Sequence, residues 1–283
     1  NLTAGGSSSA TVVTGGGAGV LEAETADSFS AGLVWTPSFA DLNIAIDYYK
    51  IEIENEVARF GAANIVAGCY LSENFPTDPL CNLFTRASAT DPIAANRNRI
   101  TDINDSYINI NRQLSEGIDL NVRYGHELKS GDLTLSARAS YILDWESQLR
   151  TASDPTKLND RIGNPEWVAN VTARYDTGDW TFNWSTDIVA ESSNDHLYAS
   201  NSATYLGETV YMVRTVDTYL NHNISVRKKM DKWTMQVGIR NLFDDTATFT
   251  SSSGGGRGAG NVPLSSQYDY LGRRGYINLT RSW

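Results

Sequence analysis

The sequence predicts an all-β fold, a transmembrane antiparallel β-barrel wall, from three observations. Nine segments alternate apolar and polar residues with a period of two, which is the pattern of a strand with one apolar face. The connections between these segments are alternately short and long, as they are in outer-membrane barrels. The last segment ends at an aromatic residue, Trp283, as the final strand of such a barrel does.

The nine expected strands are separated by clear turn signals. In chain order they lie at about residues 25–37, 41–48, 118–124, 133–143, 167–175, 180–187, 220–226, 233–243 and 267–283. Short turns at 38–40, 129–132, 176–179 and 229–232 alternate with long loops at 1–24, 58–104, 147–163, 192–211 and 246–266. Glycine in two of the short turns suits a tight hairpin, because glycine adopts positive φ without strain.

The composition fits this fold and argues against others. The chain has 283 residues, a net charge of -10 and a mean hydropathy of -0.34. It has no apolar run of roughly 18 residues, so the sequence predicts no transmembrane helix. Barrel strands do not raise the mean hydropathy, because half of each strand is polar. The acidic balance argues against a nucleic-acid partner, which requires a basic stripe.

The two faces of the expected strands differ in chemistry. The apolar faces carry aromatic residues near the strand ends, where barrels place girdles at the membrane interfaces. Trp233 and Phe243 are ten residues apart on one face, and such a spacing spans about 25 Å in a tilted strand, the height of the apolar band. In the last strand, Ile277 and Leu279 share a face with Trp283, and the three are the candidate C-terminal assembly signal. The polar faces carry charged residues that we expect to face the lumen: Asp119, Arg123, Arg138, Arg174, Asp187 and Arg240.

The number of strands bears on how the barrel closes. With nine strands, the first and the last run in the same direction, and they cannot pair in an all-antiparallel barrel. An open strand edge in lipid would leave backbone groups unpaired at high cost. We therefore expect the chain to be part of a larger barrel, and its start inside a long loop favours this reading. The alternative is a strand count that is wrong by one.

Two cysteines, Cys69 and Cys81, lie in one polar loop with eleven residues between them. In an exported protein we expect them to form a disulfide. Two free thiols are the alternative, and metal binding is less well supported because no histidine lies nearby.

The long loops are where a ligand would be selected. They carry aromatic residues that are candidate ligand contacts, with loop packing as the favoured alternative for most of them: Tyr70, Phe75, Tyr198, Tyr205 and Phe249. The pair most like a catalytic one is His196 beside Asp195, and adjacency in sequence does not make a catalytic dyad. We therefore predict no catalytic residues, no metal site and no cofactor.

Several motifs carry a family resemblance, which covers nearly the whole chain. They are Glu24–Phe29 with Gly32 and Trp35-Thr36-Pro37, Ile46-Asp47-Tyr48-Tyr49, Gly117-Ile118-Asp119-Leu120, Arg240-Asn241-Leu242-Phe243-Asp244 and Gly272-Arg273-Arg274. With the terminal aromatic residue, this order of motifs resembles the C-terminal part of TonB-dependent outer-membrane receptors. Arg281 departs from the pattern, because an apolar residue is usual at such an outward position.

The resemblance implies a barrel of about 22 strands that encloses an N-terminal plug domain. Residues 1–283 would be the C-terminal part of this barrel, with the plug and the earlier strands elsewhere, in the same protein or in a separate chain. The charged lumen residues would then meet plug side chains or water.

The function implied is that of a receptor in the outer membrane of a Gram-negative bacterium. It would bind a scarce ligand, a ferric siderophore, another metal chelate or an oligosaccharide, and import it with energy from the TonB complex. The barrel assembly machinery and membrane lipid would be further partners. A passive porin is the first alternative, and an outer-membrane barrel enzyme is the second.

Overall fold

The computed structural model describes residues 10–14, 21–148, 154–197, 200, 202–251, 258–259, 261–263 and 265–282. Trp283 and Tyr198 lie outside these residues. The chain divides into two compact units, residues 1–27, 52–113 and 147–156 in the first and residues 28–51, 114–146 and 157–283 in the second. In the described part of the chain, no helix is both long enough and apolar enough to cross a bilayer.

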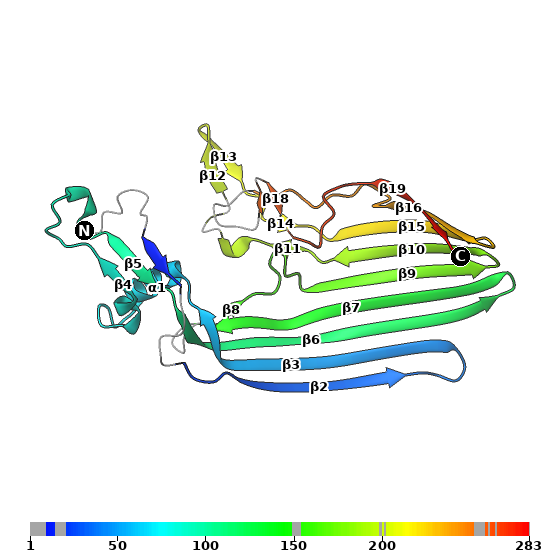
Figure 1. The fold of residues 1–283 in the computed structure, drawn as a ribbon, viewed down its shortest axis with the longest axis horizontal. Helices are drawn as coiled ribbons and strands as arrows, with labels where there is room; N and C mark the ends of the chain where they lie inside the picture. Colours follow the sequence, from blue (N-terminus) through cyan, green and yellow to red (C-terminus); the bar gives the residue numbers. More distant parts are fainter. Residues whose placement is uncertain are drawn as a thin grey trace. The chain divides into compact units, whose positions relative to one another are not determined.

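A single large sheet contains all nine expected strands, in the order β19-β16-β15-β10-β9-β7-β6-β3-β2. Figure 1 shows them side by side. Their bounds are β2 Thr25–Trp35, β3 Asp41–Arg59, β6 Tyr107–Leu128, β7 Gly131–Gln148, β9 Trp167–Thr177, β10 Trp180–Val189, β15 Tyr219–Lys229, β16 Trp233–Arg240 and β19 Arg274–Arg281. A two-residue strand, β8 (Thr156–Lys157), also pairs with β7. The prediction of an all-β, partial-barrel fold is confirmed.

The two faces of this sheet follow from the period-two alternation. In the register of β10 with its neighbours, Trp184 lies opposite Ala173 on β9 and Ile224 on β15, so apolar residues gather on one face. Large apolar side chains on this face are exposed, including Phe29 at 61% and Leu33 at 67%. Exposed apolar area costs about 25 cal/mol per Å² in water, so a continuous face of this kind requires an apolar environment.

Two expected strand ends are wrong. The eighth strand ends at Arg240 rather than 243, because Asn241 has a φ of 50° and leaves the ladder. Phe243 is therefore not on the strand, and the ten-residue spacing from Trp233 does not measure the apolar band. The ninth strand begins at Arg274 rather than 267, and the residues before it form turns. Conversely, β3, β6 and β7 extend well beyond the predicted segments.

The first unit contains a small folded core built from predicted loop residues. A three-stranded sheet of β1 (Thr11–Val13), β5 (Ile100–Asn104) and β4 (Phe84–Arg86) accompanies α1 (Ala62–Leu71) and two 3-10 helices, η1 (Pro79–Leu83) and η2 (Ala94–Asn96). β1 pairs in parallel with β5. The segment before β2 and the loop after β3 therefore fold together. We call its buried residues the disulfide core: Phe60, Ile65, Cys69, Leu80 and Ile103.

The second unit has a comparable core where its long loops meet. The short strands β11 (Ser192–Ser193) and β14 (Thr215–Val216) pair, as do β12 (Ser202–Tyr205) with β13 (Glu208–Tyr211) and β17 (Gly258–Ala259) with β18 (Val262–Pro263). A 3-10 helix, η3, spans Asp195–Leu197. We call the buried residues here the tyrosine core: Ile162, Val189, Val216, Tyr219, Ala247 and Tyr268.

Candidate functional site

A row of polar side chains crosses the sheet on the face opposite the apolar one. Cross-strand pairing places Asn170 of β9 beside Arg138 of β7 and beside Asp187 of β10, and Asp187 lies beside Asn221 of β15. The side chain of Asn170 donates a hydrogen bond of 2.6 Å to Asp187. These residues line a hollow of about 780 Å³. The row is a continuous hydrogen-bonding surface, which suits a polar partner or water.

Two predicted lumen residues extend this row. Asp119 on β6 borders the same hollow and accepts a hydrogen bond of 2.5 Å from Ser140. Arg240, at the end of β16, borders a neighbouring hollow of about 410 Å³ that Asp187 also lines. Its guanidinium group lies 5.6 Å from the centre of the Tyr276 ring. The structure therefore gathers Asp119, Arg138, Asp187 and Arg240 around two adjoining hollows.

The other two predicted lumen residues form local ion pairs instead. Arg123 lies 3.0 Å from Asp41, and both residues line a separate hollow near the short turns. Arg174 lies 2.7 Å from Asp176, and both side chains remain partly exposed. Arg123 therefore sits apart from the four residues that border the two hollows. Arg174 borders a smaller hollow that shares Asn183, Ser225 and Gln236 with the hollow of Arg240.

Residues that the sequence analysis did not single out complete the larger hollow. Asp269 precedes β19, and both its carboxylate oxygens accept hydrogen bonds of 2.8 Å from Arg274. Burial alone would raise the pKa of Asp269, but hydrogen bonds from Arg274 and from the Leu271 amide hold that pKa below its ordinary value. Asn221 borders both hollows, and its side-chain oxygen is buried without a hydrogen-bond partner among the described residues.

Asp47 also lines the larger hollow, and a glycine determines its position. A Cβ atom added at Gly32 on β2 would lie 2.0 Å from the Asp47 carboxylate. Only glycine leaves room for this side chain to lie across the neighbouring strand. The alternation of the second expected strand already placed Asp47 on the polar face, so this residue could have been predicted.

The motif around Asn241 forms a clasp between two segments. Asn241 is fully buried, and its side chain exchanges two hydrogen bonds of 2.8 Å with the backbone of Asp245. Asp244 accepts a hydrogen bond of 2.7 Å from the Arg273 amide, and Gly272, with a φ of 69°, packs beside the same carboxylate. The two motif stretches, about 240–245 and 272–274, therefore act together to fix the loop that leads into β19.

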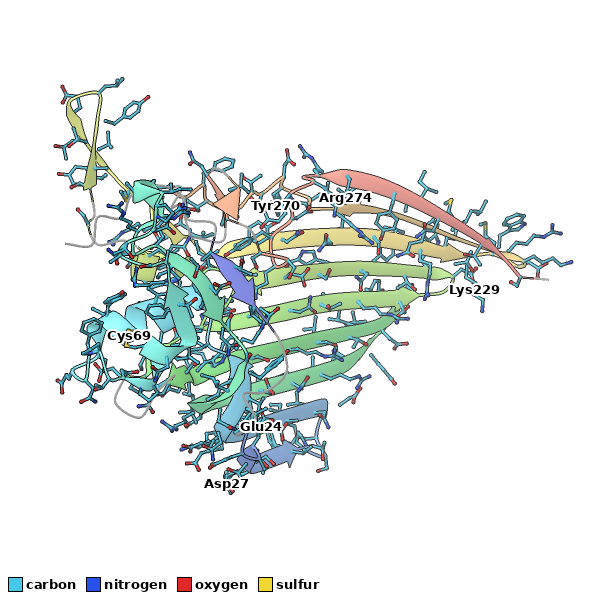
Figure 2. The ribbon with its side chains drawn as sticks, turned by 60° about the vertical axis from the view of Figure 1, so that its left-hand side comes forward. Glu24, Asp27, Cys69, Lys229, Tyr270 and Arg274 are labelled. Carbon is cyan, nitrogen blue, oxygen red and sulfur yellow. A yellow bond between two sulfur atoms is a disulfide. The ribbon has the colours of Figure 1, made fainter. Side chains whose placement is uncertain are left out.

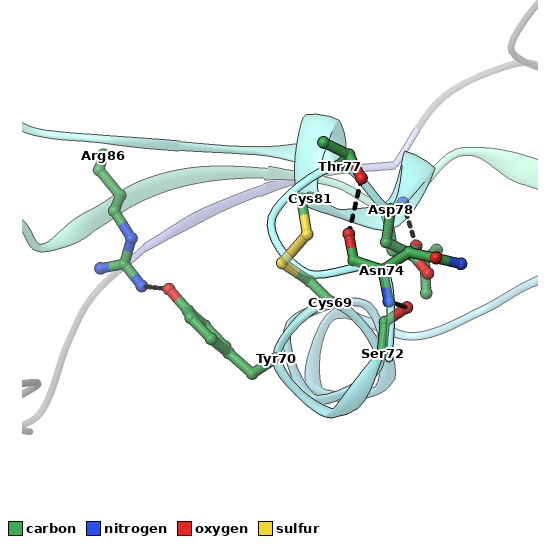
Figure 3. Close-up of a disulfide and its surroundings, with 9 residues drawn as sticks. Cys69, Tyr70, Ser72, Asn74, Thr77, Asp78, Cys81 and Arg86 are labelled. Atoms are coloured by element: carbon green, nitrogen blue, oxygen red, sulfur yellow. Dashed lines mark hydrogen bonds between the residues drawn. A yellow bond between two sulfur atoms is a disulfide. The ribbon is translucent and has the colours of Figure 1, made fainter.

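The candidate loop aromatics fall into separate groups. In the first unit, the rings of Tyr70 and Phe75 are 5.2 Å apart, and Arg86 donates a hydrogen bond to the Tyr70 hydroxyl (Figure 3). Figure 3 also shows the disulfide between Cys69 and Cys81 that joins α1 to η1. In the second unit, Tyr205 ends β12 at a hairpin turn and is 66% exposed, and Phe249 is similarly exposed. Tyr198 lies outside the described residues.

Among the residues that the structure describes, His196 and Asp195 form no catalytic pair. Asp195 instead forms an ion pair of 2.9 Å with Arg214. Burial and the charge of Arg161 lower the pKa of His196 below its ordinary value. Within the described residues, no group of three or more histidine, cysteine, aspartate or glutamate side chains could hold a metal ion.

On β19, Ile277 and Leu279 lie opposite Val237 and Met235 of β16 and are strongly exposed on the apolar face. The third residue of the candidate assembly signal, Trp283, lies outside the described residues, so that assignment stays a prediction.

Comparison with known proteins decides the family. The family described as TonB dependent receptor-like, beta-barrel matches residues 1–242. The chain belongs to this family. No curated protein sequence matches it significantly. The family and the similar solved structures are transport receptors, not enzymes.

Solved structures share the fold of this receptor barrel at low sequence identity. The ferric enterobactin receptor PfeA of Pseudomonas aeruginosa, in complex with BCV-L6, matches with a TM-score of 0.58 and 18% identity, over 93% of this chain and 32% of that one. The siderophore receptor PirA of Acinetobacter baumannii matches with a TM-score of 0.55 and 18% identity, over 94% and 32%. The copper transporter OprC matches with a TM-score of 0.53 and 14% identity, over 93% and 33%. The chain thus spans about a third of the length of these proteins.

Proposed function

We propose that this chain is the C-terminal part of the barrel of an active-transport receptor in the outer membrane of a Gram-negative bacterium. The receptor binds a scarce ligand, a ferric siderophore, another metal chelate or an oligosaccharide, and imports it into the periplasm with TonB-supplied energy. The observation that carries the proposal is a TonB-dependent receptor sheet with one exposed apolar face and one continuous polar face. Siderophore and copper receptors among the similar structures support a metal-chelate ligand.

The rest of the receptor supplies the remaining strands and the plug domain, in the same polypeptide or in a second one. Within the described sheet, β2 and β19 each have a neighbour on one side only. Two such edges in lipid carry unpaired backbone groups, so further strands must cover them. The plug contacts the TonB complex, and the barrel assembly machinery inserts the strands into the membrane.

The charged row on the polar face serves the transport path. Arg138 and Asp187 line the larger hollow, where a plug side chain or a passing polar ligand would replace water. The exposed loop aromatics of the second unit, Tyr205 and Phe249, are candidate ligand contacts. Tyr70 and Phe75 of the first unit are separate candidates.

Uptake by cells that carry the full receptor tests this function. The probes are radiolabelled ferric enterobactin, ferripyoverdine, copper ion and a maltodextrin, each supplied to cells with and without functional TonB. We expect uptake of one probe class that requires both the receptor and TonB. Uptake that persists without TonB would instead identify a passive porin, and uptake of none of the four would reject this ligand range.

Paired variants test the role of the charged row. Neutralising Arg138 and Asp187 together, as R138Q with D187N, should lower TonB-dependent uptake several-fold while the folded receptor reaches the outer membrane. The matched control, R123Q with D41N, neutralises an ion pair on the same sheet near the short turns. Equal uptake by the two double variants would contradict a specific role of Arg138 and Asp187 in transport.

A further inference from the structure

Two cationic side chains lie against indole rings on the apolar face of the sheet, close to the short turns. The Nζ atom of Lys228 is 4.6 Å from the centre of the Trp180 ring, and the guanidinium group of Arg281 is 5.5 Å from the Trp233 ring. In both cases, the cation and the indole are cross-strand partners, Trp180 with Lys228 and Trp233 with Arg281. The apolar face therefore carries two fixed positive charges near one rim.

The two pairs form a single patch. Lys228 is the cross-strand partner of Met235, and Met235 is that of Leu279, so these three residues share a row with Trp180. Trp233 and Arg281 lie two residues further along their strands, on the same face. With about 4.8 Å between strands and about 3.4 Å per residue, the Cα atoms of Lys228 and Arg281 are about 12 Å apart. The Trp180 ring lies on the other side of β15 from Arg281, so the Lys228 ammonium must swing off that ring for both cationic groups to meet one anionic group.

Positive charge is concentrated at this rim of an acidic chain. The net charge is -10, yet three of the six lysines, at 228, 229 and 232, fall within five residues and directly follow Arg227. Figure 2 shows Lys229 at the end of β15. Three carboxylates, Asp176, Asp179 and Asp231, lie in the same pair of turns and offset part of this charge. The remaining excess favours an anionic partner.

We propose that this patch binds the headgroup of an anionic phospholipid, with the phosphate between Lys228 and Arg281. The acyl chains then lie over the apolar side chains of Met235 and Leu279, and Leu279 is 60% exposed. A free phosphate would gain nothing from these apolar neighbours, so the patch fits a lipid better than a soluble anion. Short turns mark the periplasmic rim of outer-membrane barrels, which assigns the lipid to the inner leaflet. The inference rests on membrane insertion of the sheet, and on neither the transported ligand nor TonB.

Native mass spectrometry of the full receptor in neutral detergent tests the proposal. Phosphatidylglycerol or phosphatidylcholine of the same acyl chains is added, and bound lipid is counted. Wild type should retain phosphatidylglycerol in preference to phosphatidylcholine. Each of K228Q and R281Q should weaken phosphatidylglycerol binding about fivefold, the effect expected for one basic residue at an anionic membrane surface.

Lys229 provides the matched control, because it lies next to Lys228 but on the opposite face of β15. K229Q removes the same charge from the same turn and should bind phosphatidylglycerol like wild type. Equal weakening by K229Q would show a diffuse charge effect and overturn the site, as would unchanged binding by K228Q. A heat-modifiability gel reports the insertion of each variant independently of lipid binding. If K228Q fails to fold, W180L replaces it as the test. W180L keeps Lys228 but should lose part of the preference for phosphatidylglycerol.

Discussion

The disulfide core and the tyrosine core perform the same task by different means. Both hold predicted loop residues in a packed structure. The disulfide core is closed by a covalent bond between residues only twelve apart in sequence. The tyrosine core brings together residues as distant as Ile162 and Tyr268, and the Tyr219 and Tyr268 rings meet edge to face at 5.5 Å. One covalent bond can hold a single loop together, whereas several loops that meet are held together by packing between their side chains.

Hydrogen bonds between its segments link the tyrosine core, whereas a disulfide links the segments of the disulfide core. The Tyr219 hydroxyl accepts hydrogen bonds of 3.3 Å from the Asn221 side chain and from the Asp269 amide. The Tyr268 hydroxyl lies 3.3 Å from that of Ser192. Because these partners come from different segments, destabilising one segment should also destabilise the others.

The largest expected effect is loss of the disulfide. Replacing both cysteines, as C69S with C81S, should destabilise the segment from α1 to η1 by about 3 kcal/mol, because the unfolded loop gains freedom. Hydrogen exchange of residues 62–83 in the full receptor measures this loss. Residues 189–219 should keep their protection, since the tyrosine core has its own packing. Unchanged exchange at 62–83 would mean that the apolar contacts of Ile65 and Leu80 suffice without the bond.

A smaller but wider effect is expected in the tyrosine core. Val216 has no exposed surface, so V216A removes two buried methyl groups and should cost about 2 kcal/mol, including the cavity left behind. Exchange should rise together in the segments around residues 162, 189, 247 and 268, which all contact this core. A rise in exchange confined to β14 would contradict shared packing, because the tyrosine core would then be stabilised locally, as the disulfide core is. Exchange across 62–83 serves as the internal control.

Sequence reasoning predicts the sheet better than these cores, for a physical reason. Lipid on one side of the sheet and polar surroundings on the other impose an alternation of apolar and polar residues along each strand. This alternation can be recognised within a single strand, for example in residues 133–143. The error at 267–273 falls in a segment where Tyr268 is buried in a loop core rather than placed on a face of the sheet. Convergence of distant loops leaves no local signal.

The candidate site follows the same rule. Asp119, Arg138 and Asp187 could be assigned to the polar face because their parity within a strand decides it. Asp269 and Arg274 could not, because their ion pair depends on the turn before β19. The motif around Asn241 was visible as a family resemblance, but its clasp with Gly272 and Arg273 required the structure.

The smallest expected effect is a pH dependence confined to the tyrosine core. The folded pKa of Asp269 lies below the unfolded value of about 3.9, so its charged form stabilises the fold at higher pH. That stabilisation is complete above about pH 5 and is lost as pH falls through the folded pKa. Because Arg274 is partly exposed, solvent screens the pair and the effect stays modest. Exchange of residues 265–274 should therefore lose protection progressively as the pH falls below about 5 in wild type. D269N, which cannot ionise, should show less protection at pH 7 and no such step, and a step of equal size in this variant would assign the pH dependence to another group.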